Sequence, residues 1–279
     1  MKLTGDAVQI SALNPSPKKA IDNPKDTIAD LQLDLLRLQQ ACFREQKRAI
    51  ILIEGTDTAG KGGVIRRLTR HLDPRSVHVW PIGAPAKWEQ SRHYLYRFWQ
   101  KLPEPGEITV FDRTWYGRVL VERVEGYAKE TEWQRAYREL VEFERQLADD
   151  GVILIKLFLN LSKEEQTQRI WDRVKEPTKR WKITKADLDS RRYWDEYQRA
   201  YQDMLNKTAT EFAPWHVVPA NDKQTARVKS LSIIKKSLDK HVDVKKVNML
   251  DPEVIAAVIE QFGEEAFKKL VGEAYGKSD

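Results

Sequence analysis

Cysteine is almost missing from this sequence, which has only Cys42. A lone thiol cannot form an internal disulfide, and it fits a reducing compartment, so we expect a cytoplasmic protein. Long apolar runs are missing too, since none approaches the roughly 18 residues that a membrane-spanning helix needs. The first residues, Met1 to Asp6, lack the apolar core of a signal peptide. We therefore expect no membrane partner.

Internal repeats, low-complexity tracts and clustered histidines are also absent. The five histidines are scattered singly, so we assign none of them to catalysis or to zinc. Of the 279 residues, 41% are hydrophobic and 32% are charged, which is typical of a globular protein. The 48 basic and 42 acidic residues leave a net charge of +6, an excess that alone indicates no more than an anionic partner.

Short β-branched stretches alternate with segments of helical periodicity. We expect strands at 49–54, 77–80, 108–111, 151–159 and 215–218. We expect helices at 27–46, 64–72, 89–101, 115–124, 130–149, 162–175, 185–206, 225–241 and from 252 onward. This alternation predicts an α/β fold in which helices cover both faces of a parallel sheet, giving three αβα layers.

The domain organisation follows from the same pattern. Residues 1–26 carry prolines without periodicity and are expected as an N-terminal arm. Residues 27–241 are expected to form one domain. Residues 242–279 are expected as a helical extension that packs either on this domain or on a partner.

The stretch 50–64 combines a buried strand, a glycine loop, a lysine and the start of a helix. Four apolar residues run into Gly55-x4-Gly60-Lys61, which is the order of a phosphate-binding P-loop. In such a loop, backbone N–H groups and a helix N-terminus point at anionic oxygens, and glycines let the backbone approach them. The phosphate-binding residues expected here are Gly55, Thr58, Ala59, Gly60, Lys61, Gly62 and Gly63.

One position departs from the usual P-loop. The Ser or Thr that normally follows the lysine and holds magnesium is replaced by Gly62. Asp57, inside the loop, is the nearest candidate to hold the metal instead.

Asp112 and Arg113 directly follow another predicted strand. An acid at the end of a neighbouring strand is where P-loop proteins hold magnesium, so Asp57 and Asp112 are the expected metal ligands. Asp112 can also be read as the N-cap of the next helix, and both roles are compatible. Arg113, next to a phosphate site, is a plausible donor to transferring phosphoryl oxygens.

The segment 169–192 is the most basic part of the chain. Between Lys175 and Lys185 there are five basic residues and one acid, and Arg169 and Arg173 precede them with the spacing of one helix face. Such a run can be a solvated face. A helix, a basic loop and a helix inserted after a strand are also how lids of small kinases are built, and we favour this lid.

Together these motifs resemble the second polyphosphate kinase family, which moves phosphoryl groups between inorganic polyphosphate and nucleotides. The resemblance covers about residues 30–240 and rests on 54–63, 111–118, 121–122, the lid segment 169–182 and 214–223. It implies a thymidylate-kinase-like P-loop kinase fold with a helical lid. It also implies dependence on Mg2+, with Mn2+ as a substitute, and a polyphosphate channel lined by basic residues.

The resemblance also implies roles for single residues. Asp57 matches a loop aspartate that engages the metal and the accepting phosphate, and Asp112 matches a metal-binding acid. Lys61 matches a phosphate-binding lysine, Arg113 a catalytic arginine, and Arg173 a lid arginine that touches the transferred group. Further contacts with phosphate or nucleotide are implied for Arg118, Glu122, Arg169, Lys179 and Lys182.

The residues of two motifs indicate which nucleotide accepts the phosphoryl group. Residues 115–126 and 180–184 resemble the AMP-phosphorylating group, whereas diphosphate-using members more often carry Asn at the position of Gly117. We therefore expect AMP as the favoured acceptor, with ADP or GDP as further ones. Members of the AMP group frequently have two fused copies of the domain, and this chain has one. We expect a homo-oligomer, a dimer or tetramer, in place of the fused copy.

Two other functions are compatible with parts of this pattern. An ATP-dependent nucleoside monophosphate kinase would share the loop, the acid and the lid. A non-catalytic binder of polyanions or nucleic acid would use the basic segment with Trp181, Tyr193 and Trp194, but we expect these aromatics to pack between helices. Because anion binding gains nothing from Asp57 and Asp112, we expect no nucleic-acid partner.

Overall fold

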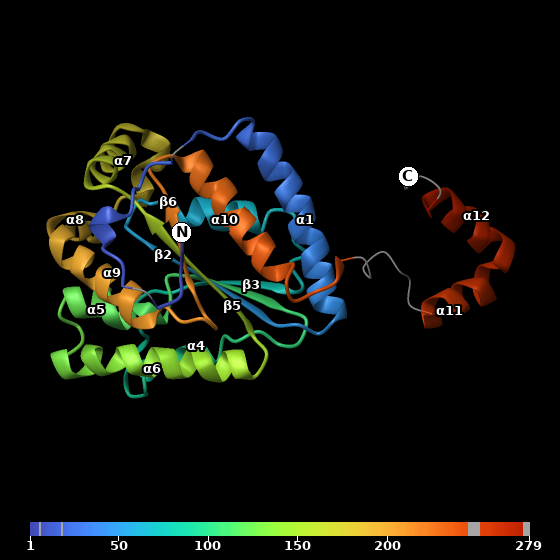
Figure 1. Ribbon diagram of the computed structural model, residues 1–279, viewed down its shortest axis with the longest axis horizontal. Coiled ribbons are helices and arrows are strands. Elements are labelled where there is room, and N and C mark those ends of the chain that lie inside the picture. The colour runs from blue at the N-terminus through green and yellow to red at the C-terminus, as the bar shows by residue number, and fades with distance from the viewer. Residues whose placement is uncertain (6, 18, 245–251, 276–279) are drawn as a thin grey trace.

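The protein is built on a six-stranded sheet with the strand order β1-β6-β5-β2-β4-β3 (Figure 1). The computed structural model describes residues 1–279 except 6, 18, 245–251 and 276–279. The strands are β1 (Lys2–Leu3), β2 (Ala49–Gly55), β3 (Val77–Pro81), β4 (Ile108–Asp112), β5 (Ile153–Asn160) and β6 (Trp215–Pro219). Strands β2 to β6 are parallel, which confirms the predicted sheet, and β1 pairs antiparallel with β6.

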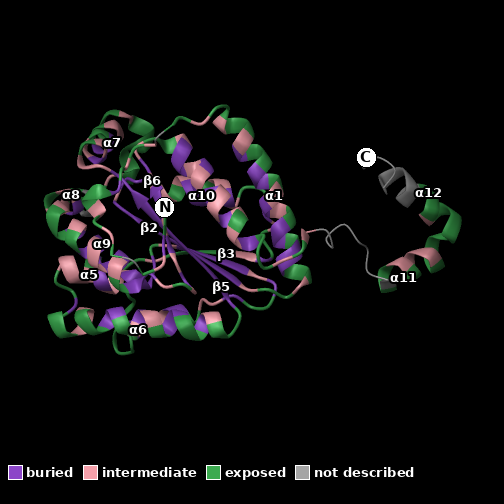
Figure 2. Cartoon of the chain, in the orientation of Figure 1, coloured by how far each residue is buried: buried purple, intermediate pink, exposed green. Residues whose placement is uncertain are grey.

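Helices cover both faces of the sheet, as predicted. The helices and 3-10 turns are η1 (Ile10–Ala12), α1 (Pro24–Arg44), α2 (Lys61–Leu68), α3 (Lys87–Gln90), α4 (Tyr96–Trp99), η2 (Trp115–Val119), α5 (Val121–Val124), α6 (Glu130–Asp149), α7 (Lys163–Lys175), η3 (Pro177–Lys182), α8 (Lys185–Arg192), α9 (Trp194–Thr208), α10 (Lys223–Leu238), α11 (Pro252–Phe262) and α12 (Glu264–Tyr275). Figure 2 shows their buried residues facing the strands.

The core has two halves, because successive side chains of a strand point to opposite faces. Ile50 and Leu52 of β2 belong to the half that packs against α6 and α9. Ile51 and Ile53 belong to the half that packs against α1, α2 and α10. All four are fully buried, which is why β2 reads as a continuous apolar run.

Four predicted helices are divided in the structure. The segment 89–101 forms only α3 and α4, and 115–124 forms η2 followed by α5. The helix expected at 185–206 is interrupted at Tyr193, between α8 and α9. The helix expected from 252 is broken at Gly263, whose φ of +86° ends α11. Helical periodicity predicted the apolar faces, but packing and a left-handed glycine decide where the backbone turns.

The N-terminal residues lie on the domain, although the sequence gives them no periodicity. Leu3 is buried, and β1 adds an edge strand beside Trp215 and His216 of β6. The backbone N–H groups of Val8 and Ile10 donate to side chains of α9. A two-residue strand is too short to produce an alternating pattern, so this pairing could not be read from the sequence.

Helices α11 and α12 contact each other and lie apart from the sheet in Figure 1. In the described part of the chain, no helix has both the length and the apolar character that crossing a membrane requires. Cys42 has no exposed surface, and burial raises the pKa of its thiol to about 11, as expected for a core residue.

A fully buried ion pair joins the sheet to the helices behind it. The ammonium of Lys156 on β5 lies 2.7 Å from a carboxylate oxygen of Glu144 on α6, and both side chains have no exposed surface. The other oxygen of Glu144 accepts hydrogen bonds from Trp115 and Tyr116 of η2. Lys156 also donates to the carbonyl of Thr208 on α9. Four elements, β5, α6, η2 and α9, are therefore joined by charges that have no exposed surface.

We predict that Glu144→Gln lowers the free energy of unfolding by about 3–5 kcal/mol, because it leaves the Lys156 ammonium buried without a counter-charge. The amide oxygen can still accept the bonds from Trp115 and Tyr116, so the loss reports the charge. Urea unfolding at pH 7 measures it. The control is Glu142→Gln on the same helix, whose exposed pair with Arg138 spans 3.5 Å and should contribute no more than about 1 kcal/mol. Equal losses in both variants would contradict the prediction.

A second prediction concerns acid stability. Burial, followed by the nearby charges of Lys2 and the N-terminal amine, lowers the pKa of His216 from 6.5 to about 4. Between these values the unfolded chain binds a proton that the folded chain does not, so the free energy of unfolding falls as the pH drops from 6.5 to 4. His216→Gln should make this fall shallower, as measured by urea unfolding across this range. An unchanged slope would refute the assignment.

Candidate functional site

The candidate site lies where the carboxyl ends of β2 and β4 meet. Ile53 of β2 is paired with Asp112 of β4, so the loop after β2 and the corner after β4 start at the same edge of the sheet. Ligands of parallel α/β sheets bind at this edge. The sequence predicted this meeting of the two motifs.

The phosphate loop has an unusual backbone. Gly55 has φ +147° and lies against Leu159 of β5, Thr58 has φ +67°, and Gly60 has φ +103°. Helix α2 begins at Lys61, three residues earlier than predicted, since the N–H of Val64 already bonds to the carbonyl of Gly60. Positive φ at the two glycines is inexpensive, whereas Thr58 must be held there by its surroundings.

Two hydroxyls of the loop have no partner among the described residues. Thr56 and Thr58 are both buried, yet neither side-chain oxygen makes a hydrogen bond. A buried hydroxyl without a partner costs free energy, so both are ready to bond to a ligand oxygen. This supports Thr58 as a predicted contact and adds Thr56, which the sequence reasoning missed.

Asp57 lies close to two cationic side chains of the site. Its Oδ1 lies 3.4 Å from the guanidinium of Arg113 and 3.6 Å from the ammonium of Lys61. Lys61 also donates to the carbonyl of Gly55 at 2.8 Å. Partial burial works to lower the pKa of Arg113, but Asp57, Glu54 and Asp112 outweigh it and the pKa is raised. Three carboxylates therefore surround one guanidinium.

The predicted metal ligands fit a magnesium site of the kind completed by substrate. Asp57 and Asp112 supply carboxylate oxygens, which are hard ligands suited to Mg2+. Among the residues that the structure describes, no group of three or more acidic, histidine or cysteine side chains could hold a metal alone. Mg2+ typically takes one or two carboxylates and completes its shell with water and phosphate oxygens, so two aspartates suffice.

The corner after β4 corrects one reading of Asp112. The N-cap of η2 is Thr114, whose hydroxyl accepts from the N–H of Tyr116, and Asp112 is not used as a cap. Arg113 occupies the left-handed region with φ +62°. Behind it, Glu54 of β2 accepts two hydrogen bonds from Thr114. Glu54 was missed, although an acid at the end of an apolar strand was a visible signal.

Arg169 has a different position from the one that the sequence suggested. Its side chain is only 3% exposed, and every guanidinium nitrogen donates to the protein. The acceptors are Glu165 and the carbonyls of Thr58, Ala59, Ala220 and Asn221. In this conformation Arg169 therefore braces the phosphate loop, and its predicted contact with phosphate or nucleotide stays a prediction.

The remaining predicted lid residues lie on α7 and η3. Arg173 donates to the carbonyl of Lys182, and Lys179 and Lys182 are exposed. Trp181 is 77% exposed, so our expectation that it packs between helices is wrong. The Lys182 ammonium lies 5.2 Å from the centre of its ring. This part of the chain presents cations and an indole to solvent.

Arg118 and Glu122 form a separate cluster beside the corner. Arg118 lies 3.1 Å from the carboxylate of Glu122 and stacks 4.5 Å from the ring centre of Tyr94. Burial raises the pKa of Glu122, against the charges of Arg118 and Arg97. A Cβ added at Gly117 would lie 3.8 Å from Val121 and 4.0 Å from Glu122, at ordinary van der Waals distances.

A basic surface between α2 and α10 was not predicted. We call it the α2–α10 surface, and it consists of Arg66, Arg67, Arg70, Lys223 and Arg227. Burial and then the charges of Arg66 and Arg70 lower the pKa of Arg67, and burial and then Arg67 lower that of Arg227. Both guanidinium groups lie near Gly63 of the loop. Cations that repel one another in this way are stabilised by an anion.

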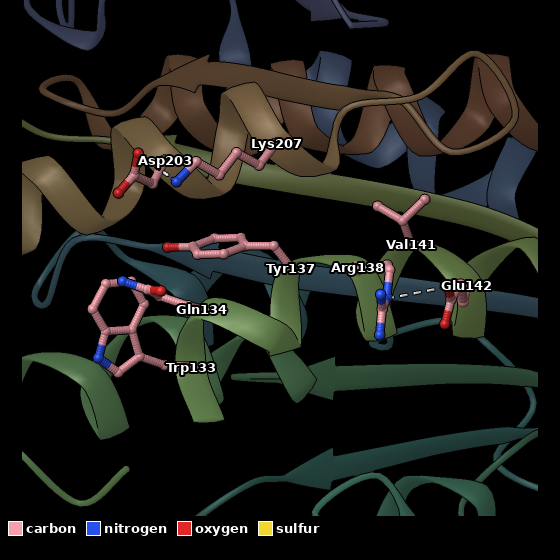
Figure 3. A pocket seen from close by; sticks show the side chains of 8 residues that line it. All are labelled: Trp133, Gln134, Tyr137, Arg138, Val141, Glu142, Asp203 and Lys207. Carbon is pink, nitrogen blue, oxygen red and sulfur yellow. Dashed lines mark ion pairs between the residues drawn. The ribbon is translucent and has the colours of Figure 1, made fainter. Parts of the chain in front are cut away.

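A groove lies elsewhere, between α6 and α9 (Figure 3). Its volume is about 750 Å³, and none of the predicted site residues lines it. Its charged groups are paired with each other, Arg138 with Glu142 and Lys207 with Asp203. We therefore place the site at the sheet edge, where strained backbone and unpaired hydroxyls converge.

We predict that Gly55→Ala disrupts the loop. An added Cβ would lie 2.6 Å from the carbonyl oxygen of Leu159, and φ +147° is strained for any other residue. The free energy of unfolding should fall by about 1–3 kcal/mol. The matched control is Gly62→Ala, where a Cβ meets nothing within 4 Å, so it should fold with parental stability. Urea unfolding compares them, and equal stabilities would rule out the close approach.

Comparison with known proteins agrees with this geometry. The family model of polyphosphate kinase 2 matches residues 18–246. A polyphosphate:AMP phosphotransferase of Pseudomonas syringae pv. tomato is 48% identical over 198 residues, which are 71% of this chain and 40% of that protein. An AMP/ADP-polyphosphate phosphotransferase of Meiothermus ruber is 39% identical over 218 residues, 76% of this chain and 82% of that protein.

A solved structure shows the same fold. The crystal structure of polyphosphate kinase 2 from Arthrobacter aurescens TC1 superimposes with a TM-score of 0.84 at 34% identity, covering 92% of this chain and 95% of that one. The chain spans less than half the length of the Pseudomonas syringae relative. Over most of its own length, nonetheless, the chain belongs to the polyphosphate kinase 2 family.

Proposed function

We propose that this protein transfers a phosphoryl group from inorganic polyphosphate to a nucleotide, with AMP as the favoured acceptor and ADP or GDP as further ones. The observation that carries the proposal is the convergence of Lys61 and Arg113 on Asp57 above a P-loop that lacks the usual hydroxyl. Two cations suited to phosphate and an acid suited to a metal thus lie around one point, which supports the proposal. The similarity to a polyphosphate:AMP phosphotransferase and to an AMP/ADP-polyphosphate phosphotransferase supports both the donor and the acceptor.

The donor chain fits the α2–α10 surface. A polyphosphate carries a negative charge on each phosphate unit, so it needs a row of cations longer than a nucleotide does. Arg67 and Arg227 lie beside Gly63, next to the loop that would hold the reacting phosphate. Lys179 and Lys182 on the lid offer further cations that can close over the chain. This arrangement supports polyphosphate over ATP as donor.

The chemistry requires positioning more than proton transfer. A nucleotide phosphate is already anionic at neutral pH, so the attacking oxygen needs little help from a base. Loop N–H groups, Lys61 and Arg113 would hold the transferred phosphoryl in line and stabilise the charge on its oxygens. Arg173 would add a donor from the lid. Magnesium held by Asp57 and Asp112 supplies positive charge that offsets the repulsion between two polyanions.

The nucleotide would lie beside Arg118 and Glu122. Both side chains come from the segment directly after the Asp112–Arg113 corner, so a group held by them reaches the same edge of the sheet. Gly117, next to Glu122, adds no side chain that would compete with the acceptor for this position. We further propose that the enzyme works in the cytoplasm, as the single cysteine suggests, and as a homo-oligomer, a dimer or tetramer.

The prediction from this proposal concerns the donor. Purified protein given AMP, polyphosphate and Mg2+ without ATP should form ADP, as measured by chromatography. Lys61→Ala and Asp112→Asn should each lower the rate by about 10²–10³-fold, because the first removes a cation from the reacting phosphate and the second weakens the hold on magnesium.

The control variant is Arg138→Ala, which removes an exposed cation from the α6–α9 groove and should keep the parental rate. Replacing polyphosphate by ATP tests for an ordinary nucleoside monophosphate kinase. Formation of ADP only in the presence of ATP, or parental rates for both site variants, would refute the proposal. Assays with ADP or GDP in place of AMP establish which nucleotide is the preferred acceptor.

A further inference from the structure

A buried acid, Glu54, lies beneath the site and is used by none of the steps above. It is the sixth residue of β2 and directly precedes Gly55 of the phosphate loop. Only 4% of its surface is exposed. Burying a carboxylate costs free energy unless it is hydrogen-bonded, so we expect Glu54 to have a hydrogen-bond partner and a role at this place.

The partner of Glu54 is Thr114, on the other side of the site. One carboxylate oxygen, Oε1, accepts from the backbone N–H of Thr114 at 2.7 Å and from its hydroxyl at 2.8 Å. The hydroxyl in turn accepts from the N–H of Tyr116 at 3.1 Å. A single oxygen of β2 therefore fixes both the backbone and the side chain at the start of η2.

The residue that this contact holds in place is Arg113. Its φ of +62° is unfavourable for a residue with a Cβ, so the corner needs an anchor outside itself. Thr114, the residue that Glu54 anchors, directly follows Arg113 in the chain, and Asp112 directly precedes Arg113. Loosening Thr114 would let the backbone relax and would carry both side chains away from Asp57 and the loop.

The charge of Glu54 fits this position as well. Burial raises the pKa of Glu54, while the charge of Lys61, the hydrogen bonds from Thr114 and the charge of Arg113 act to lower it. Two cations of the site thus face the carboxylate from above. A general-base role is not suggested, because Oε1 is already committed to Thr114 and the acceptor phosphate has no proton that must be removed.

We propose that Glu54 is a positioning residue for phosphoryl transfer, which fixes the Asp112–Arg113 corner against the phosphate loop through its paired hydrogen bonds to Thr114. The kinetic part of this proposal rests on the proposed function. Glu54 touches neither phosphate nor metal in it, and acts only through the corner.

The kinetic test uses polyphosphate and AMP with two replacements of Glu54. Glu54→Ala removes the acceptor, and kcat should fall by about 10²-fold because Arg113 is misplaced, while KM for polyphosphate changes less than about threefold. Glu54→Gln keeps an acceptor oxygen for both donors and should restore most of the loss. A kcat for Glu54→Gln as low as that of Glu54→Ala would overturn the proposal.

A double-mutant cycle tests whether the effect passes through Thr114. Thr114→Val removes the hydroxyl and should lower kcat less than Glu54→Ala, since the backbone N–H remains. The combined variant should lose much less than the product of the two single losses, because both remove the same contact. Multiplicative losses would overturn the proposal. Thr109→Val, which replaces a buried and unpartnered hydroxyl on β4, is the control and should keep the parental rate.

A third readout needs no phosphoryl transfer. Amide hydrogen exchange of residues 112–116, measured without substrate, should be slow in the parent and in Glu54→Gln and at least about tenfold faster in Glu54→Ala. Thermal unfolding identifies any variant that fails to fold, and Thr114→Val, which removes the hydroxyl that bonds to Glu54, then replaces Glu54→Ala and should also exchange faster than the parent. Equal exchange in all variants would refute the proposal. A parent that forms no product from polyphosphate would refute the proposed function, and the exchange rates would still decide on Glu54.

Discussion

The parallel pairing of β2 with β4 is the constraint on which the site depends. Because Ile53 is in register with Asp112, the two chain reversals that follow these strands occur at the same height and face each other. A register shifted by one residue would turn Asp112 to the other face of the sheet. The register is fixed in turn by burial on both faces, since every residue of β2 is buried and its apolar side chains divide between the two core halves. The packing of the core therefore sets the relative positions of the residues in the site.

The strained backbone at this edge is held by buried charges. Thr58 and Arg113 both have positive φ. The buried Arg169 donates to the carbonyls of Thr58 and Ala59. The buried Glu54 accepts from Thr114, which directly follows Arg113. A buried charge is stable only when its hydrogen-bonding capacity is satisfied, and a satisfied one is rigid. Farther from the edge, Lys156 and Glu144 fix η2 from behind in the same way. The fold accepts the cost of desolvation at the places where a left-handed backbone needs an anchor outside itself.

Much of this could be predicted from the sequence, because strand, loop and lysine are contiguous and their order has a direct physical meaning. The placement of Asp57, Lys61, Asp112 and Arg113 at one edge followed from the rule that parallel strands end together. The role of Arg169 could not be predicted, because four of its acceptors are backbone carbonyls, which no sequence pattern marks. The breaks in α3–α4 and at Tyr193 were missed for a related reason: periodicity reports which face is apolar, whereas the turns depend on tertiary packing. Trp181 was misplaced because a tryptophan usually packs, and its exposure depends on the shape of η3.

Distances separate the parts of the site that hold the fold from those that await a ligand. Arg169 bonds to its acceptors at 2.6–3.2 Å, within the range of good charged hydrogen bonds. Asp57, by contrast, lies 3.4 Å from Arg113 and 3.6 Å from Lys61, beyond the 2.7–2.9 Å typical of strong pairs. Such long pairs keep the cations near the loop without saturating them, so incoming phosphate oxygens can take over as partners at little cost. Replacing Asp57 by a neutral residue would leave two cations repelling each other over an empty loop. The acid therefore serves to organise the site before any substrate arrives.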